Sequence, residues 1–321
     1  MKRVIQGIAG ILAVALHVTA FAQSYPSRPV KIVVPLSTGS ATDTLTRLVA
    51  QKLSDQWGSP VIVENVPGAN GTIATASVIK AAPDGYTLIM IAANHVINAS
   101  LYRNLSYDTL KDVKPITRVA FTPLVLSVHP SIPVQSVKDY IELANAKPGQ
   151  INYGSAGNGS ATHLAGEMFK TMAGANITHV PYKAISQAQT DLLGGQIESM
   201  FVVLSAAIPQ INAGKIRALG VTSMQRMPQL PQVPTIDEAG VKGYEVASWI
   251  GLAAPAGTPD AIVNKIHADL AKIIAQQDFL QRISANGLES ALLGPKEFGE
   301  FMAKDQAKWA DVVKQSGARL D

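Results

Sequence analysis

A glycine-rich turn between a strand-like and a helix-like segment is the feature of the sequence best suited to bind a small molecule. The stretch 151–170, INYGSAGNGSATHLAGEMFK, begins with strand-forming residues and continues with apolar residues at helical spacing. Ser160, or Gly159 before it, is the expected N-cap. The first amides of a helix lack carbonyl partners and carry part of the helix dipole, so such a turn can hold a carboxylate or phosphate without Lys or Arg. A tight turn that binds nothing is the alternative.

Better-known glycine motifs do not fit this turn. A dinucleotide fingerprint needs G-x-G-x-x-G and a following acid, whereas Gly154, Gly157 and Gly159 give G-x-x-G-x-G and the segment 178–183 holds no acid. No Gly-Lys-Ser/Thr follows, which excludes a P-loop. Tyr153 replaces the first glycine of a nucleophile elbow.

The stretch 32–53 repeats the same plan of strand, loop and helix. Ser40 and Asp43 resemble a capping box, so we expect Asp43 to be mainly structural. Asn94 and His95 follow another predicted strand, where they can face a ligand or cap a turn.

Strands and helices alternate along most of the sequence, which predicts an α/β fold with mostly parallel sheets and ligands at the carboxyl ends of the strands. Strands are expected at 30–34, 61–64, 87–92, 121–128, 151–153, 178–180, 197–204, 216–222 and 244–254. Helices are expected at 41–53, 72–81, after 136, after 160, at 187–193, at 208–213 and from 258–260 onward. The segment 100–114 reads as irregular, and two helices, 295–302 and 302–316, finish the chain without a further strand.

The N-terminus predicts export. Lys2 and Arg3 precede an apolar run that ends in Ala20-Phe21-Ala22, which indicates a signal peptide, residues 1–22, cut after Ala22; an uncleaved membrane anchor is the alternative. Without Lys2 and Arg3 the chain has 25 basic and 23 acidic residues, a net charge of +2, and no basic tract, which argues against nucleic acid. The absence of cysteine excludes disulfides and thiolate sites.

An exported serine hydrolase is the rival interpretation. Ser37, Ser155 and His163 are candidate nucleophiles and base, but His163 falls in the first turn of a helix, where capping or surface polarity is expected. His163 and Glu167 have the spacing of a metal pair without a third ligand, so a solvated helix face is expected and no metal or other cofactor is predicted.

The chain resembles the extracytoplasmic solute-binding proteins of the Bordetella uptake gene (Bug) family, which serve tripartite tricarboxylate transporters. The matching stretches span the predicted mature chain: IVVPLSTGSATDTLTRLVAQKL, VIVENVPGANGTIA, PDGYTL, LYRNLSYD, INYGSAGNGSATHLAGE, HVPYKAISQAQTDLLGGQIESMF, GKIRALGVTS, LPQVPTIDEAG and WIGLAAPAGTP. The resemblance implies a two-lobed periplasmic binding protein of type II, with lobe 1 formed by 23–122 and 246–321 and lobe 2 by 123–245. It further implies a non-enzymatic, monomeric receptor in the periplasm that hands its ligand to membrane transporter subunits.

The same resemblance implies that a small carboxylate is held between the lobes by main-chain and hydroxyl groups of two loops. The ligand can be a dicarboxylate or tricarboxylate, an aromatic carboxylate or an acidic amino acid. The implied ligand-binding residues are Leu36, Ser37, Thr38, Gly39, Ser40, Thr42, Asn94, Ser155, Ala156, Gly157, Gly159, Ser160, Thr162, Tyr182 and Asp191.

Some of these positions carry further expectations. Leu36, Ser40 and Ala184 depart from the family's usual aromatic, glycine and glycine, which bears on ligand identity. Asp191 is expected either to bind a loop amide or ligand ammonium group, or to be an N-terminal acid of its own helix. Trp249 is expected to pack rather than to stack on ligand.

Overall fold

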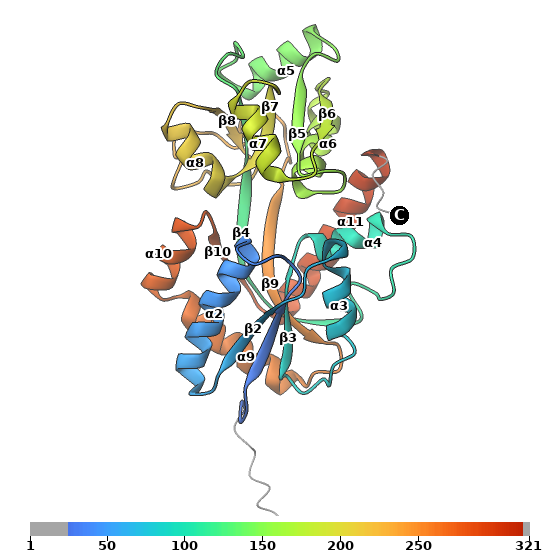
Figure 1. Cartoon of the computed structure of the whole chain (residues 1–321), viewed down its shortest axis with the longest axis vertical. Helices are drawn as coiled ribbons and strands as arrows, with labels where there is room; N and C mark the ends of the chain where they lie inside the picture. The colour runs from blue at the N-terminus through green and yellow to red at the C-terminus, as the bar shows by residue number, and fades with distance from the viewer. Residues whose placement is uncertain (1–24, 317–321) are drawn as a thin grey trace, which may run out of the picture.

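The protein consists of two α/β lobes joined by two strands, as seen in a computed structural model that describes residues 25–316 (Figure 1). The strands are β1 (Val30–Val34), β2 (Val61–Asn65), β3 (Thr87–Ala92), β4 (Val113–Val128), β5 (Asn152–Ser155), β6 (Thr178–Pro181), β7 (Ser199–Val203), β8 (Arg217–Val221), β9 (Ala247–Pro255) and β10 (Glu289–Leu293). The helices are α2 (Ala41–Trp57), η2 (Ala69–Gly71), α3 (Thr72–Val78), α4 (Asn94–Leu101), α5 (Val137–Ala146), α6 (Ala161–Ala173), α7 (Ile185–Leu193), α8 (Leu204–Asn212), α9 (Asp260–Ile274), α10 (Gln277–Ala285) and α11 (Pro295–Ser316).

The direction of the strands brings carboxyl ends of strands from both lobes to the hinge. In the lobe at the bottom of Figure 1, called the lower lobe and corresponding to the expected lobe 1, β1 pairs in parallel with β2 and β3, and β9 runs antiparallel to β3. The other lobe is called the upper lobe and corresponds to the expected lobe 2. In the upper lobe β5 pairs in parallel with β6 and β7, and β4 runs antiparallel to β7. Because β4 enters the upper lobe and β9 leaves it, the carboxyl ends of β1, β3, β5 and β7 all face the other lobe (Figure 1).

Successive side chains of a strand point to opposite faces of the sheet, and in the lower lobe both faces are apolar. Helices therefore pack on both faces of this sheet. Ile32, Leu88 and Met90 pack with α2, α9 and α10. Val33, Ile89 and Ile91, one residue out of step, pack on the opposite face with α3, α4 and α11.

The upper lobe has the same layering, and one of its cores continues into the lower lobe. Val125 and Val202 pack with α7 and α8, whereas Leu126 and Phe201 pack with α5 and α6 on the other face. Trp309 of α11 belongs to the same hydrophobic cluster as α6, and α11 contacts both α4 and α6. Helix α11 therefore links the two lobes at the side of the hinge.

The structure corrects the sequence-based elements in several places, including the unexpected helix α4, which ends at Leu101 inside the segment expected to be irregular. Strand β4 begins at Val113, inside the segment expected to be irregular; it contains Pro115, beside which the pairing with β9 shifts register. Helix α10 and the short strand β10, which pairs with β4, were not expected before Pro295. The last two predicted helices are one, α11, because Met302 is buried in the middle of a continuous apolar face.

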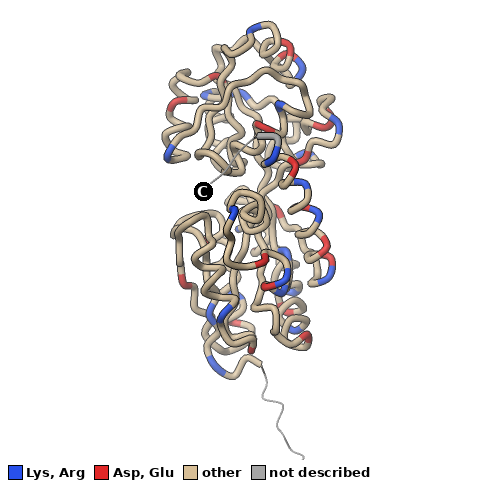
Figure 2. The backbone as a smooth tube through the Cα atoms, turned by 90° about the vertical axis from the view of Figure 1, so that its right-hand side faces the viewer, with Lys and Arg blue, Asp and Glu red and all other residues tan. Residues whose placement is uncertain are grey.

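The predicted leader and its cleavage site lie outside the described residues. Within residues 25–316, none of the helices has both the length and the apolar character needed to cross a bilayer. In the view of Figure 2, basic and acidic residues are scattered in small groups over both lobes.

Candidate functional site

The loop after β1 is closed by contacts of its own residues. Ser40 is the N-cap of α2, and its Oγ accepts the amide of Asp43 at 3.2 Å. The Asp43 carboxylate in turn accepts the amide of Gly39 at 2.9 Å, at a positive φ of 82° that favours glycine. The structural role predicted for Asp43 is therefore present, although the box closes on Gly39 rather than on Ser40.

The loop after β5 repeats this arrangement in the other lobe. Ser160 is the N-cap of α6, as predicted, and its Oγ accepts the amide of His163 at 3.3 Å. Nδ1 of His163 accepts the amide of Gly159 at 3.1 Å, and Gly159 has a φ of 75°. The tetrapeptide Gly-Ser-Ala-Thr occurs at both sites, at 39–42 and 159–162. The shared local sequence therefore accompanies the same arrangement in both loops: a glycine at positive φ, a serine N-cap, and a side chain three residues later that accepts the glycine amide.

Both loops leave helix amides without a protein acceptor. Among the described residues, no protein acceptor takes the amides of Ala41 and Thr42 in α2, nor those of Ala161 and Thr162 in α6. Neither loop contains Lys or Arg. Since the loops follow strands whose carboxyl ends face the other lobe, both helix N-termini lie on the side of their lobe that faces the hinge. Such a pair of dipoles and free N–H groups suits an anion.

Side-chain hydrogen bonds fix the backbone of the glycine loop, residues 155–162. Oγ of Ser155 accepts the amide of Gly157 at 3.0 Å and lies 2.6 Å from Nε2 of His179. The amide of Ala156 donates to Oγ1 of Thr162 at 3.0 Å. Three rings stack beneath the loop, with centroids 5.0 Å apart for Tyr153 and His179 and 4.0 Å apart for His179 and His163. The loop is thus held at Ala156, Gly157 and Gly159 by side chains.

The surroundings keep both imidazoles neutral. The pKa of His179 is lowered to about 4, chiefly by burial and in addition by the neighbouring His163. The pKa of His163 is lowered as well, chiefly by burial, against the opposing effect of Glu167. In the other loop burial raises the pKa of Asp43, but hydrogen bonds from Arg47, Gly39 and Asn65 outweigh burial and leave this pKa below its ordinary value.

Outside the two loops, the predicted site residues have partners within the protein. The Nδ2 group of Asn94 donates to the Asn70 carbonyl at 2.6 Å and so ties α4 to the turn after β2. The Tyr182 hydroxyl donates to Asp191 at 2.7 Å, which, after burial, helps raise the pKa of Tyr182 to about 12. Asp191 lies near the carboxyl end of α7, so the alternative of an acid at the helix N-terminus was wrong. The role of all these residues in ligand binding remains a prediction.

Two expectations for histidines are settled by burial. His95 is buried, and its Nε2 contacts the Thr109 carbonyl at 2.7 Å, which is a structural role. His163 is only 5% exposed, so a solvated helix face was wrong and the capping alternative is correct. Its neighbour Glu167 instead accepts the Tyr153 hydroxyl at 2.6 Å. Among the described residues, no group of three or more His, Cys, Asp or Glu side chains is arranged to hold a metal ion.

Sequence reasoning missed the supporting residues His179 and Asn65. Nδ2 of Asn65 donates to Asp43 at 2.9 Å and to the Leu36 carbonyl at 3.1 Å, which fixes the first loop. The repeated Gly-Ser-Ala-Thr is a sequence signal for a different pair: it aligns His163 with Asp43, the two side chains that accept the amide of the loop glycine. It does not point to His179 or Asn65.

A family model, a sequence relative and two solved structures all relate this chain to the same protein family. A model of the "Tripartite tricarboxylate transporter family receptor" matches residues 45–318. The BugT protein of Bordetella pertussis is 32% identical over 323 residues, covering 100% of this chain and 99% of BugT. An R. palustris protein solved with adipate is 38% identical, with a TM-score of 0.80 over 92% of this chain and 100% of that chain. MatC from Rhodopseudomonas palustris, solved with bound malate, is 31% identical, with a TM-score of 0.74 over 90% of this chain and all of MatC. The chain therefore belongs to the Bug family of solute-binding proteins, the receptors of tripartite tricarboxylate transporters.

Proposed function

We propose that this receptor captures a small carboxylate between its two lobes and presents it to the membrane subunits of a tripartite transporter. The observation that carries the proposal is a helix N-terminus in each lobe that has two amides without a protein acceptor and follows a loop without Lys or Arg. Relatives solved with adipate and malate support a carboxylate as the ligand class. The residues proposed to form the site are those of the two loops, 36–42 and 155–162, together with Asn94, Tyr182 and Asp191.

Uncharged N–H and O–H donors can bind a carboxylate with micromolar affinity without a Lys or Arg side chain. A hydrogen bond to a charged group contributes about 1.5–3 kcal/mol, and a partly buried helix terminus contributes up to about 2 kcal/mol. Micromolar binding requires about 8 kcal/mol after association costs, which a handful of such contacts supplies. A carboxylate held this way should depend only weakly on ionic strength, because its charge is met by buried dipoles rather than by exposed ion pairs.

A thermal-shift screen over aliphatic, aromatic and amino-acid carboxylates, with adipate and malate included, tests the proposal. A ligand that binds only the folded state raises the unfolding midpoint by mass action. Matched amides of the same acids serve as controls, since they lack the anion. If no carboxylate raises the midpoint, or if each amide acts as well as its acid, the proposed ligand class is wrong.

The hydrolase alternative has one observation in its favour, the 2.6 Å contact between Ser155 and His179. Against it, the Ser155 side chain is fully buried and already accepts the Gly157 amide, so it presents no accessible nucleophile. Incubation with ester and amide substrates should show no turnover. Hydrolysis that disappears in Ser155→Ala would refute the receptor assignment.

Export to the periplasm is proposed from the sequence of residues 1–22. Intact-mass measurement of the protein recovered from its native envelope should give a chain that starts at Gln23. A mature pool that still carries Met1 would contradict cleavage.

A further inference from the structure

The two loops use different side chains for the same task. In α2 the Asp43 carboxylate accepts the amide of Gly39, and in α6 Nδ1 of His163 accepts the amide of Gly159. A carboxylate accepts hydrogen bonds over the whole neutral and mildly acidic range, whereas an imidazole nitrogen accepts only while it carries no proton. The upper loop therefore depends on the protonation state of one residue, and the lower loop does not.

We propose that His163 is a positioning residue of the carboxylate site. Its unprotonated Nδ1 fixes the Gly159 amide and thereby holds the loop in the shape that leaves the amides of Ala161 and Thr162 open to the ligand. This inference rests on the proposed function, since it assigns a role at the same site. It distinguishes His163 from Ser155, whose hydroxyl anchors the Gly157 amide and can still accept it whichever way His179 is protonated.

The groups around His163 make its protonation unfavourable. His179 of β6 stacks on it, with ring centroids 4.0 Å apart, and Tyr153 of β5 stacks on His179. On α6 itself Glu167 favours the protonated form and Lys170 opposes it, and these two are joined by an ion pair of 3.1 Å. Leu101 of α4 lies against Gly159, and α11 joins the cluster of α6 through Trp309; both contacts are apolar.

The pH dependence follows from which state binds. The pKa of His163 lies below 6.5, so the neutral acceptor dominates at pH 7. As the pH falls through that pKa, Nδ1 gains a proton, and two donors, the backbone N–H of Gly159 and the ring Nδ1–H of His163, face each other at the position of the former hydrogen bond. The loop must then move, and affinity for the carboxylate falls on the acidic side only.

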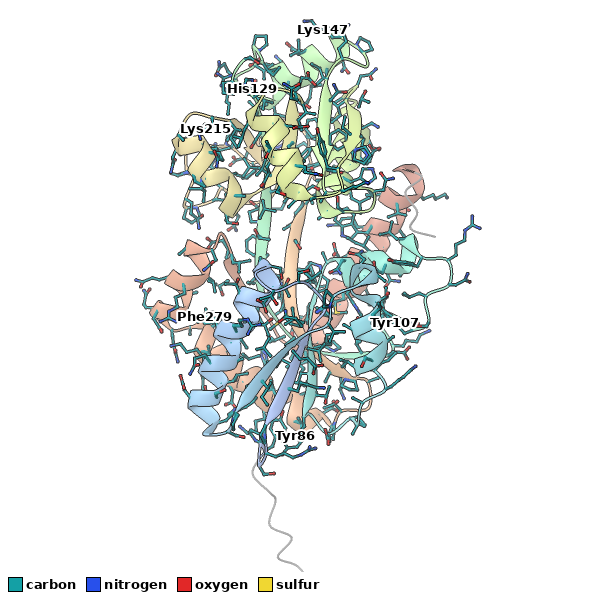
Figure 3. The ribbon with its side chains drawn as sticks, in the orientation of Figure 1. Tyr86, Tyr107, His129, Lys147, Lys215 and Phe279 are labelled. Carbon is teal, nitrogen blue, oxygen red and sulfur yellow. The ribbon has the colours of Figure 1, made fainter. Side chains whose placement is uncertain are left out.

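Two substitutions separate the acceptor from the ring. His163→Asn supplies a non-titrating oxygen at the reach that Asp43 already uses in the other loop, and His163→Phe keeps the ring stack but has no acceptor. His129→Gln is the control, because His129 lies in the upper part of the upper lobe, away from the hinge (Figure 3). All four proteins, wild type included, are titrated with adipate from pH 7.5 to pH 5. If adipate gives no thermal shift, the carboxylate with the largest shift in the screen above replaces it.

We expect the Phe variant to bind about tenfold more weakly than wild type at pH 7.5, a difference of about 1.4 kcal/mol. The Asn variant should match wild type there and keep its affinity at acidic pH, where wild type and His129→Gln lose theirs together. Comparison of wild type with the Asn variant at each pH cancels the titration of the ligand itself. Equal pH profiles for these two, affinity that rises on acidification, or a Phe variant that binds as wild type would overturn the proposal.

A ligand-free measurement keeps this test separate from the proposed function. Nitrogen chemical shifts of the imidazole should show the Nε2–H tautomer of His163 at pH 7, and exchange of the Gly159 amide should be faster in the Phe variant than in the Asn variant. An Nδ1–H tautomer would refute the role of His163 even if the protein binds carboxylates. If no carboxylate binds at any pH, the proposed function fails, and the tautomer and exchange data still decide what holds the loop.

Discussion

Gly39, in the first loop of the proposed anion site, has a backbone angle on which that loop depends. Its φ of 82° lies in the region that residues with a Cβ avoid, and its amide donates to Asp43. A Cβ placed on Gly39 would meet no atom within 4 Å, so any effect of a larger residue comes from the backbone rather than from a clash. The same holds for Gly58, which ends α2 at a φ of 61°.

Gly39→Val should therefore weaken carboxylate binding by at least tenfold, because the strained loop reorients the open amides of Ala41 and Thr42. Gly58→Val is the matched control: both variants should lose about 1–3 kcal/mol of folding stability, but only the first should lose affinity. Thermal melts and isothermal titration calorimetry of the two proteins measure both quantities. Equal affinities would place the carboxylate elsewhere.

Ser155→Ala should weaken binding by about tenfold without unfolding the protein, since one buried hydrogen bond contributes about 1 kcal/mol and the Gly157 amide loses its acceptor. Ser127→Ala, which removes another buried hydroxyl of the upper lobe in β4, provides the control and should leave affinity unchanged. Calorimetric titration of both variants with the same carboxylate is the measurement. A silent Ser155→Ala, combined with loss of binding on neutralising one Lys or Arg elsewhere, would indicate a conventional salt bridge.

At the scale of elements, the parts that could be predicted from the sequence are those in which local signals agree with the final packing. Strand β3 was expected with its true bounds, a helix was expected after residue 136, and Ser160 at the end of the glycine-rich turn was an expected N-cap. The short strand β10 carries no clear alternation and exists because the edge of β4 is there to pair with it. Likewise the contact between Ser155 and His179 joins separate strands, and no spacing in the sequence reveals it.

The contact between β9 and α11 stabilises the hinge strand from one side. Nε1 of Trp249 donates to Asp305 at 2.7 Å, and the indole packs edge-on against Phe298 and Phe301, which confirms that Trp249 packs within the protein. Both partners of this hydrogen bond are buried, so the loss of the donor leaves a carboxylate served mainly by Lys308.

Trp249→Phe should accordingly lower folding stability by about 1–3 kcal/mol, which is several degrees in Tm for a chain of this size. Asp305→Asn keeps an oxygen acceptor for the indole and should cost less. Thermal melts at neutral pH compare the two. A Trp249→Phe protein as stable as wild type would show that the hydrogen bond contributes nothing beyond the ring packing.

At the scale of the whole molecule, two strands and a few side contacts hold the lobes together. The Leu101 side chain lies against Gly159 on one side of the hinge, and the backbone of Gly287 lies against Ser205 on the other. The lobe boundaries near residues 122 and 246 remain a prediction; β4 spans Val113–Val128 and β9 begins at Ala247. We expect rotation about these strands to bring the two loops together while each lobe keeps its own sheet.

Small-angle scattering should show a smaller radius of gyration when a verified carboxylate saturates the protein, because the anion is shared between the lobes. The Gly39→Val protein at the same carboxylate concentration is the control and should stay extended. An unchanged radius in wild type under proven saturation would mean that one lobe alone holds the ligand.

Because β3 pairs with β9, which comes much later in the sequence, the lower sheet cannot fold completely until the C-terminal segment is available. A chain that is delivered N-terminus first makes β1, β2 and β3 early, but the strand that covers β3 and the helices α9, α10 and α11 arrive last. The upper lobe, encoded between them, can complete its sheet in the meantime. During that interval the hydrogen-bonding edge of β3 is open to the wrong partner, so the newly made protein is most prone to aggregate just before its C-terminal segment emerges.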